Sequence, residues 1–177
     1  RYSFLGKDPF LVVRARDGVT VVERAGTSET SPDGFIATVR RLMADFRAPY
    51  VPHLPRFTGG AVGYLSYDAA EWFEPVPSAR GPLEGPGLAT DLATFMLFDT
   101  VLAFDHVQHR ILLIANARIS GDEDLRALYQ FACAKVAFLE RELERALSMA
   151  KQPSTETLAL ESNVTQPAFE AIVQQAK

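Results

Sequence analysis

Cysteine and histidine are scarce in this sequence of 177 residues, which holds one cysteine, Cys133, and three histidines. A single thiol cannot form an internal disulfide, and Cys133 lies in a helix-like run, so we expect a buried core residue rather than a reactive nucleophile. His106 and His109 fall in a short polar link, whereas a zinc site needs about three or four ligands. The histidine pair therefore favours a solvated turn over a metal site.

Long apolar runs and an excess of positive charge are also missing. No apolar stretch approaches the roughly 18–20 residues that cross a bilayer, and the first residues lack the pattern of a signal peptide. Lys and Arg number 18 against 22 Asp and Glu, so the formal net charge is −4. This charge offers no electrostatic footprint for a phosphate backbone or an anionic membrane. We therefore expect a cytoplasmic protein that binds neither nucleic acid nor membranes.

The common catalytic patterns are absent as well. The sequence has no G-x-S-x-G elbow, and Ser3 and Ser66 fall in strand-like runs. Gly59, Gly60 and Gly63 precede a predicted strand instead of joining a strand to a helix, which argues against a Rossmann or P-loop phosphate site. Glycine in such a place more often marks a bulge or a close approach of another backbone. We expect a structural role for these glycines and no complete catalytic constellation in the chain.

A β-hairpin and a helix are predicted in the first part of the sequence. Residues 10–16 and 19–24 are rich in strand-forming side chains, and Asp17-Gly18 between them favours a type I′ turn. Residues 32–47 carry apolar side chains at helical spacing. The hairpin and the helix can bury these apolar side chains against each other.

Three further strands are predicted in the middle of the sequence. The first covers 61–67, and Asp68 after it is expected to cap a short helix. A surface loop rich in Pro and Gly follows at 75–87. The apolar runs 93–104 and 110–119 are joined by a link too short for a crossover helix, so we expect them to pair antiparallel.

A long amphipathic helix over 122–150, a polar connector over 151–162 and the start of another helix at 166–177 complete the pattern. Together these elements predict an α+β fold, a layered, mainly antiparallel β-sheet with packed helices. We expect one domain over 1–150, a linker over 151–162, and the beginning of a second domain at 163–177.

Four segments carry a resemblance to a known family. They are RYSFLG at 1–6, FTGGAVGYLSYDAAEWFE at 57–74, FDTVLAFDHVQHRILLIANA at 98–117 and SNVTQPAFEAIVQQAK at 162–177. In this order they resemble component I, the large subunit, of anthranilate synthase. The resemblance extends over nearly the whole chain and is weakest in the Pro- and Gly-rich loop around 75–90.

The resemblance implies what the parent protein does. Enzymes of this family convert chorismate and ammonia to anthranilate and pyruvate in tryptophan biosynthesis, with Mg²⁺ as cofactor. A glutamine amidotransferase subunit, component II, supplies the ammonia. Residues 1–150 would then form the N-terminal regulatory and structural domain, and 163–177 the truncated start of the chorismate-binding catalytic domain. Both ends of the chain would be cut, and we expect the chorismate and Mg²⁺ ligands beyond Lys177.

One regulatory residue follows from the same resemblance. In the family's feedback element for tryptophan, a second serine follows an earlier Leu-Leu-Glu-Ser, and that second serine corresponds to Ser3. A plain polar residue on a strand remains the alternative for Ser3. No catalytic residue and no metal ligand can be carried over to this chain, so we expect it to be inactive alone.

Two other interpretations remain open. The large subunit of aminodeoxychorismate synthase is similar to this family and also acts on chorismate, although RYSFLG at 1–6 favours anthranilate synthase. From a different class, the chain could be a stand-alone amino-acid-binding or subunit-interaction module. The incomplete helix at 166–177 argues against such a module, because a helix of that length is marginal in water without tertiary support.

Overall fold

The computed structural model describes residues 1–74, 91–148 and 162–177, which divide into two compact units, Arg1–Leu143 and Glu144–Lys177. The predicted loop at 75–87 lies outside the described residues, as does the predicted connector except for its last residue. No helix in the described part of the chain is long and apolar enough to cross a membrane. The domain boundaries expected above stay predictions.

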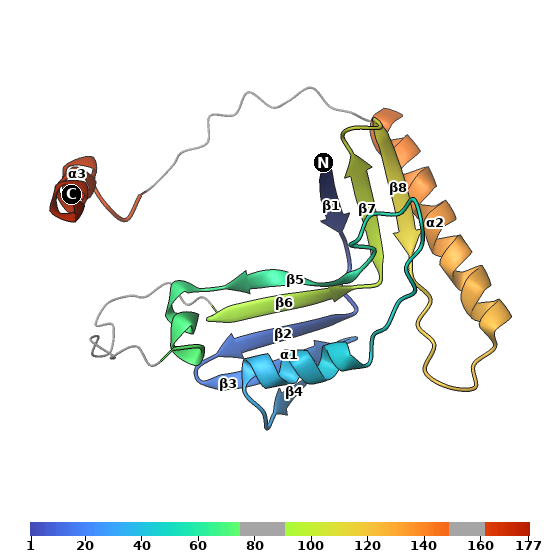
Figure 1. Cartoon of the computed structure of the whole chain (residues 1–177), viewed down its shortest axis with the longest axis horizontal. Helices are drawn as coiled ribbons and strands as arrows, with labels where there is room; N and C mark the ends of the chain where they lie inside the picture. The colour runs from blue at the N-terminus through green and yellow to red at the C-terminus, as the bar shows by residue number, and fades with distance from the viewer. Residues whose placement is uncertain (75–90, 149–161) are drawn as a thin grey trace. The chain divides into compact units, whose positions relative to one another are not determined.

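A five-stranded antiparallel sheet, in the order β4-β3-β2-β6-β5, is the largest sheet of the described residues (Figure 1). Its strands are β2 (Leu11–Arg16), β3 (Val19–Arg24), β4 (Thr27–Ser31), β5 (Gly60–Leu65) and β6 (Ala93–Phe98). The β2–β3 hairpin turns at Asp17 and Gly18, whose φ angles are 51° and 76°. Both angles are positive, as a type I′ turn requires, so the predicted hairpin is confirmed.

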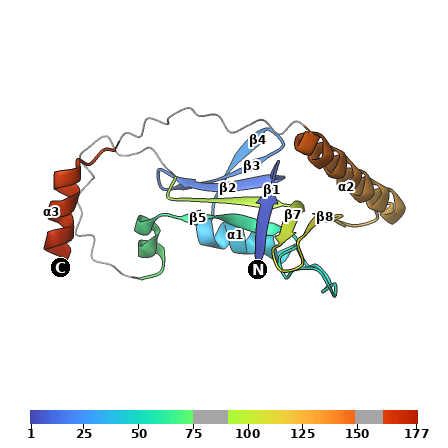
Figure 2. The same ribbon diagram turned by 90° about the horizontal axis from the view of Figure 1, so that it is seen from above.

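Helix α1 (Phe35–Ala44) covers one face of this sheet (Figure 2). Alternate residues of β2 point to the helix and are buried, among them Leu11 and Val13, and Leu42 from α1 joins the same core. The helix is shorter than the predicted 32–47, because Gly34 and Asp45 are its end caps. The apolar periodicity identified the helix correctly, but it could not set the ends, where few side chains are buried.

A second, three-stranded antiparallel sheet has the order β1-β7-β8 within the described residues. Its strands are β1 (Tyr2–Gly6), β7 (Thr100–Asp105) and β8 (Arg110–Ala115). The pairing of β7 with β8 confirms the antiparallel arrangement expected for the two apolar runs. A separate core lies on one face of this sheet and is built from Phe98, Val101, Ala103 and Ile114.

The single strand predicted over 93–104 is wrong, because the run breaks at Asp99 and its two halves enter different sheets. The carbonyl of Asp99 accepts hydrogen bonds from the backbone N–H of Asn116, at 2.8 Å, and from its side-chain amide, at 3.0 Å. The same amide donates to the carbonyl of Thr58 at 2.7 Å. Apolar residues continue on both sides of the break, so the hydrophobic pattern does not reveal it.

The glycines before and within β5 allow close backbone contacts, as predicted. A Cβ on Gly59, whose φ is 157°, would lie 2.9 Å from the carbonyl oxygen of Phe98. A Cβ on Gly63 would overlap the carbonyl oxygen of Thr94 and the Phe95 side chain on the neighbouring strand. Both positions therefore require glycine for steric reasons.

The 3₁₀ helix η1 (Tyr67–Trp72) follows β5, and its N-cap is Ser66. The prediction that Asp68 caps this helix is wrong, since Asp68 lies in its first turn. A carboxylate there still suits the positive end of the helix dipole, which explains why the sequence pattern was misleading. Trp72 stacks on Phe35 of α1 with ring centroids 5.5 Å apart, so η1 adds to the main core.

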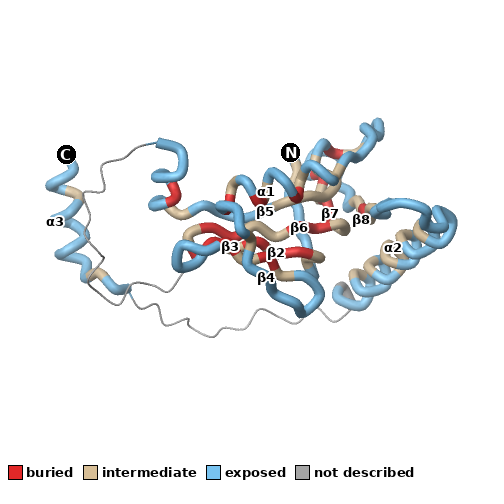
Figure 3. The backbone as a smooth tube through the Cα atoms, turned by 90° about the horizontal axis from the view of Figure 1, so that it is seen from below, coloured by how far each residue is buried: buried red, intermediate tan, exposed pale blue. Residues whose placement is uncertain are grey.

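Helix α2 (Leu125–Ser148) begins after Asp124, whose carboxylate accepts hydrogen bonds from the N–H groups of Arg126 and Ala127. One stripe of the helix is partly buried and much of the rest is exposed (Figure 3). The expectation that Cys133 is buried is wrong, because its thiol is exposed. Cys133 directly follows the partly buried Ala132, and one residue turns a helix by about 100°, which places it off the stripe.

The second unit contains helix α3 (Gln166–Ala176), which begins at the N-cap Thr165 and has Pro167 in its first turn. Both features agree with the predicted start. None of its described residues is buried, and Phe169 and Ile172 are exposed.

Candidate functional site

Ser3, the residue predicted to be regulatory, lies on β1 beside the turn that joins β7 and β8. Its hydroxyl oxygen is 2.8 Å from Nε2 of His106, the first residue of that turn. The backbone N–H of His106 also donates to the carbonyl oxygen of Arg1, at 3.0 Å. The backbone and the side chain of His106 therefore both hydrogen bond to β1 or to the residue before it, and they hold the turn against this strand.

The face of the sheet that carries Ser3 is otherwise apolar. Ser3 pairs across the strands with Phe104, and Phe104 pairs with Ile111, so these three residues form one row. The next row on the same face consists of Leu5, Leu102 and Leu113. Leu5 is 53% exposed and Ile111 is 48% exposed, so part of this face is open to solvent. We call these six residues the Ser3 face.

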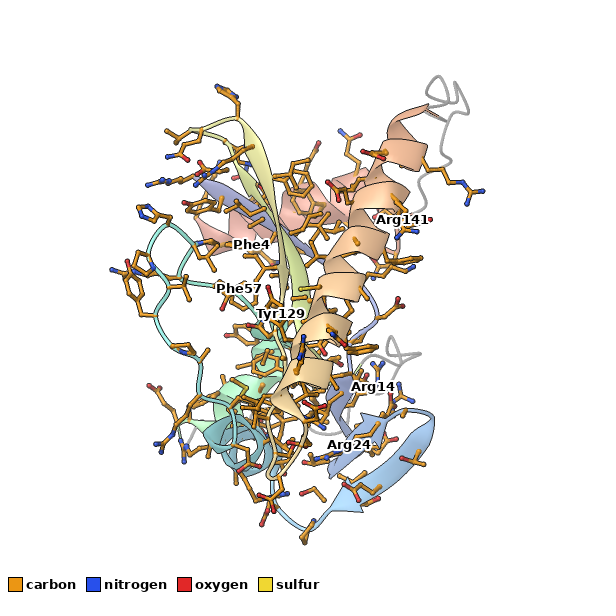
Figure 4. The ribbon with its side chains drawn as sticks, turned by 90° about the vertical axis from the view of Figure 1, so that its right-hand side faces the viewer. Phe4, Arg14, Arg24, Phe57, Tyr129 and Arg141 are labelled. Atoms are coloured by element: carbon orange, nitrogen blue, oxygen red, sulfur yellow. The ribbon has the colours of Figure 1, made fainter. Side chains whose placement is uncertain are left out.

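The opposite face of the same sheet is covered by aromatic side chains. Phe4 and Phe57 meet edge to face there, with ring centroids 5.1 Å apart. Figure 4 shows Phe4 and Phe57 on one side of the strands and α2 on the other. Helix α2 therefore packs on the side of the sheet that carries the Ser3 face.

A buried carboxylate fixes the turn that holds His106. The side chain of Asp105 is fully buried, and its Oδ1 accepts hydrogen bonds from the N–H groups of Val107 and Gln108, at 3.1 and 3.2 Å. Burial alone would raise the pKa of Asp105, but the two N–H groups and the charge of Arg1 lower it overall. Asp105 is therefore held as a carboxylate that organises the turn.

The Ser3–His106 pair is not a catalytic dyad. In a serine nucleophile site, a carboxylate orients the imidazole and backbone N–H groups stabilise an oxyanion. In the described part of the chain, no carboxylate hydrogen bonds to the His106 ring, and both residues are exposed. The pair can instead offer the Ser3 hydroxyl to a bound molecule.

The described residues do not fit a metal ion, because no three His, Cys, Asp or Glu side chains among them converge. We assign no Mg²⁺ contact to this part of the chain. Hollows of about 390 and 400 Å³ lie beside α1 and share Arg24 and Leu42 in their walls, but their lining residues do not include Ser3 or His106.

A second polar cluster was not predicted from the sequence. Buried Asp91 accepts hydrogen bonds from Arg14 at 2.9 Å, Arg16 at 2.6 Å and Thr94 at 3.1 Å. Burial works to raise the pKa of Asp91, but the hydrogen bonds from both arginines and Thr94 lower it overall. Every oxygen of the carboxylate has a partner, so the cluster is structural. The sequence held no signal for it, because Asp91 is 77 and 75 residues from Arg14 and Arg16.

The chain is similar to known proteins in sequence and in fold. No protein-family model matches the chain. The chain is 32% identical to anthranilate synthase component 1 of Acetivibrio thermocellus over 187 aligned residues, which cover all of the chain and 36% of that protein. It is 32% identical to the Saccharomyces cerevisiae protein of the same name, with 96% of the chain and 32% of the relative covered. The chain thus spans about a third of the length of these relatives.

A solved structure shares the fold. The crystal structure of anthranilate synthase component I from Streptococcus pneumoniae matches 99% of this chain and 37% of its own, with a TM-score of 0.60 and 21% identity. The α+β arrangement of antiparallel sheets and helices is therefore also found in anthranilate synthase component I of Streptococcus pneumoniae. Over its whole length the chain is thus similar in sequence to about a third of anthranilate synthase component 1 proteins, which confirms the resemblance.

Proposed function

We propose that this chain is the N-terminal supporting and regulatory part of an anthranilate synthase large subunit. The parent enzyme would convert chorismate and ammonia to anthranilate and pyruvate in the cytoplasm, as a step of tryptophan biosynthesis. An amidotransferase, component II, would supply ammonia from glutamine, and Mg²⁺ would be bound by residues outside this chain. The names of the relatives, which specify a component 1, support a partner of this kind.

The observation that carries a regulatory role is the position of Ser3. Tryptophan combines a flat apolar ring with an indole N–H and charged amino and carboxylate groups. The Ser3 face combines exposed apolar side chains, Leu5 and Ile111, with the Ser3 hydroxyl at one end. Such a surface matches an aromatic amino acid in both its apolar and its polar parts.

The chain alone is proposed to be inactive and to act through the catalytic domain. Feedback needs a ligand with different affinities for two states of the enzyme, since a ligand shifts an equilibrium only by that difference. A site on a supporting domain can provide this difference when the catalytic domain contacts it. Anthranilate formation by the purified chain, with chorismate, ammonia and Mg²⁺, would contradict this part of the proposal.

The test replaces Ser3 in the full-length subunit and measures tryptophan inhibition by anthranilate fluorescence. Loss of one hydrogen bond in Ser3→Ala should raise the inhibition constant about 3- to 10-fold. Ser3→Leu should raise it further by filling space on the Ser3 face. The KM for chorismate should stay unchanged, and Ser28→Ala, at an exposed serine of β4, is the matched control. Unchanged inhibition in both Ser3 variants would exclude Ser3 from the feedback site.

The same assay separates the two chorismate enzymes. Anthranilate is fluorescent and is released directly, whereas aminodeoxychorismate synthase would give a different product. The names of the relatives above support anthranilate.

A further inference from the structure

His106 has no role in the function proposed above, although it lies in direct contact with Ser3. The Ser3 hydroxyl is bonded to Nε2 of His106 at 2.8 Å, and the rest of its row consists of Phe104 and Ile111. Neither neighbour in the row has a side-chain hydrogen-bonding group. Within the described part of the chain, His106 is therefore the side chain that determines where the Ser3 hydroxyl points.

The position of His106 is itself well defined. Its N–H is bonded to the carbonyl oxygen of Arg1, and the residue before it, Asp105, is buried and accepts hydrogen bonds from Val107 and Gln108. Arg1 and Arg110 also approach Oδ2 of Asp105, at 3.6 and 3.9 Å. The imidazole is thus held by an organised turn even though it is exposed.

The contact has a chemical consequence for Ser3. In the tautomer of His106 whose Nε2 carries no proton, the Ser3 hydroxyl donates to Nε2 and keeps its oxygen lone pairs free, so it accepts a hydrogen bond from a ligand N–H. An unrestrained serine hydroxyl rotates among several positions and must be ordered when the ligand binds. A partner that holds the hydroxyl in advance lowers that cost and raises the affinity.

We propose that His106 is a positioning residue of the regulatory site, which orients the Ser3 hydroxyl so that its oxygen accepts a hydrogen bond from an N–H group of the bound aromatic amino acid. This inference rests on the proposed function of Ser3. His106 acts through Ser3, so the segment FDH at 104–106 supplies a part of the site although His106 is 103 residues from Ser3 in the sequence.

The test is a double-substitution cycle in the full-length subunit, with tryptophan inhibition of anthranilate formation as the readout. His106→Leu should raise the inhibition constant about 3- to 10-fold, as expected for one hydrogen bond, while kcat and the KM for chorismate stay unchanged. His106→Gln places an amide near the position of Nε2 and should restore most of the affinity. His109→Asn, in the same turn, is the control, because Asn tolerates the φ of 50° found at His109.

The double variant Ser3→Ala/His106→Leu should be no more weakly inhibited than Ser3→Ala alone, because His106 acts only through the hydroxyl. Additive losses, or no loss in His106→Leu, would overturn the inference while leaving Ser3 in place. No loss in Ser3→Ala would instead contradict the proposed function. Equal melting temperatures of His106→Leu and His109→Asn would show that a change in inhibition is not caused by misfolding. If His106→Leu is unstable, His106→Gln provides a second test.

Discussion

The Nζ atom of Lys135 on α2 lies 2.8 Å from Oδ2 of Asp99, the residue at which the chain passes from the five-stranded sheet to the three-stranded sheet. Both side chains are about 30% exposed, at 30% and 31%. The other oxygen of Asp99 accepts a hydrogen bond from Thr100 at 2.7 Å. This ion pair ties the long helix to the junction of the two sheets.

Replacing Lys135 should therefore loosen α2 from the sheets. We expect Lys135→Met to lower the free energy of unfolding by about 0.5–1 kcal/mol, a value limited by solvent screening of a partly exposed pair. Lys7→Met is the control, because the Lys7–Asp8 pair is largely exposed and should contribute almost nothing. Urea unfolding followed by circular dichroism measures both, and equal losses in the two variants would argue against an anchoring role.

Asp91 should be among the most sensitive polar positions of the described residues. Asp91→Asn removes the charge that two arginines share, and we expect a loss of about 1–2 kcal/mol, moderated because both arginines are partly exposed. Glu29→Gln on β4 is the control, since Glu29 is exposed. The midpoint of urea unfolding at neutral pH measures the difference.

The lowered pKa of Asp91 adds a pH dependence with a definite sign. A carboxylate with a lower pKa in the folded state stabilises the protein fully above the ordinary value of about 3.9, and this stabilisation is lost as pH falls through the lowered pKa. The stability difference between the original protein and Asp91→Asn should therefore shrink as pH falls from about 5 to 3. A constant difference over this range would show that the charge does not contribute.

Gly63 should not tolerate even one methyl group. Gly63→Ala places a Cβ against the Thr94 carbonyl and the Phe95 side chain, so β5 must move away from β6, at a cost of about 2–4 kcal/mol. Gly121→Ala is the matched control, because nothing lies within 4 Å of a Cβ there. Thermal unfolding should separate the two, and a Gly63→Ala variant as stable as Gly121→Ala would mean that the strands pair differently.

Cys133 should react with a thiol reagent in the folded chain. Its thiol is exposed and is the single thiol of the sequence, so labelling should proceed nearly as fast in buffer as in urea. The pKa of the neighbouring Tyr129 is raised by a hydrogen bond with Cys133 and by the negative charge of the Cys133 thiolate. Cys133→Ala should therefore lower the pKa of Tyr129, which a titration followed by ultraviolet absorbance measures. Slow labelling of Cys133 in buffer would instead indicate a covered thiol.

Sequence patterns correctly predicted those turns and helices that are determined by residues close together in the chain. The Asp17-Gly18 turn follows from the backbone freedom of its two residues, and α1 follows from the spacing of its apolar side chains. The glycines around β5 were correctly expected to allow a close approach. Each of these features depends on interactions within a few residues or on the absence of a side chain.

Errors arose where distant residues decide the structure. The break at Asp99 depends on Asn116, 17 residues away, and nothing in the apolar run itself requires it. The exposure of Cys133 depends on which stripe of α2 meets the sheet, and the Asp91 cluster depends on strand β2. The pattern of a helix gives its apolar side but not how much of that side a neighbour covers.

By itself the sequence determined the α+β class, most strands and helices, and the resemblance to a family, because periodicity, turn residues and ordered motifs are properties of the chain. It also singled out Ser3. Only the tertiary structure brought His106 to Ser3, since the β1–β7 register joins residues 103 positions apart. Only the structure divided the strands between two sheets, because long-range backbone hydrogen bonds, and not local preference, select the partner of each strand.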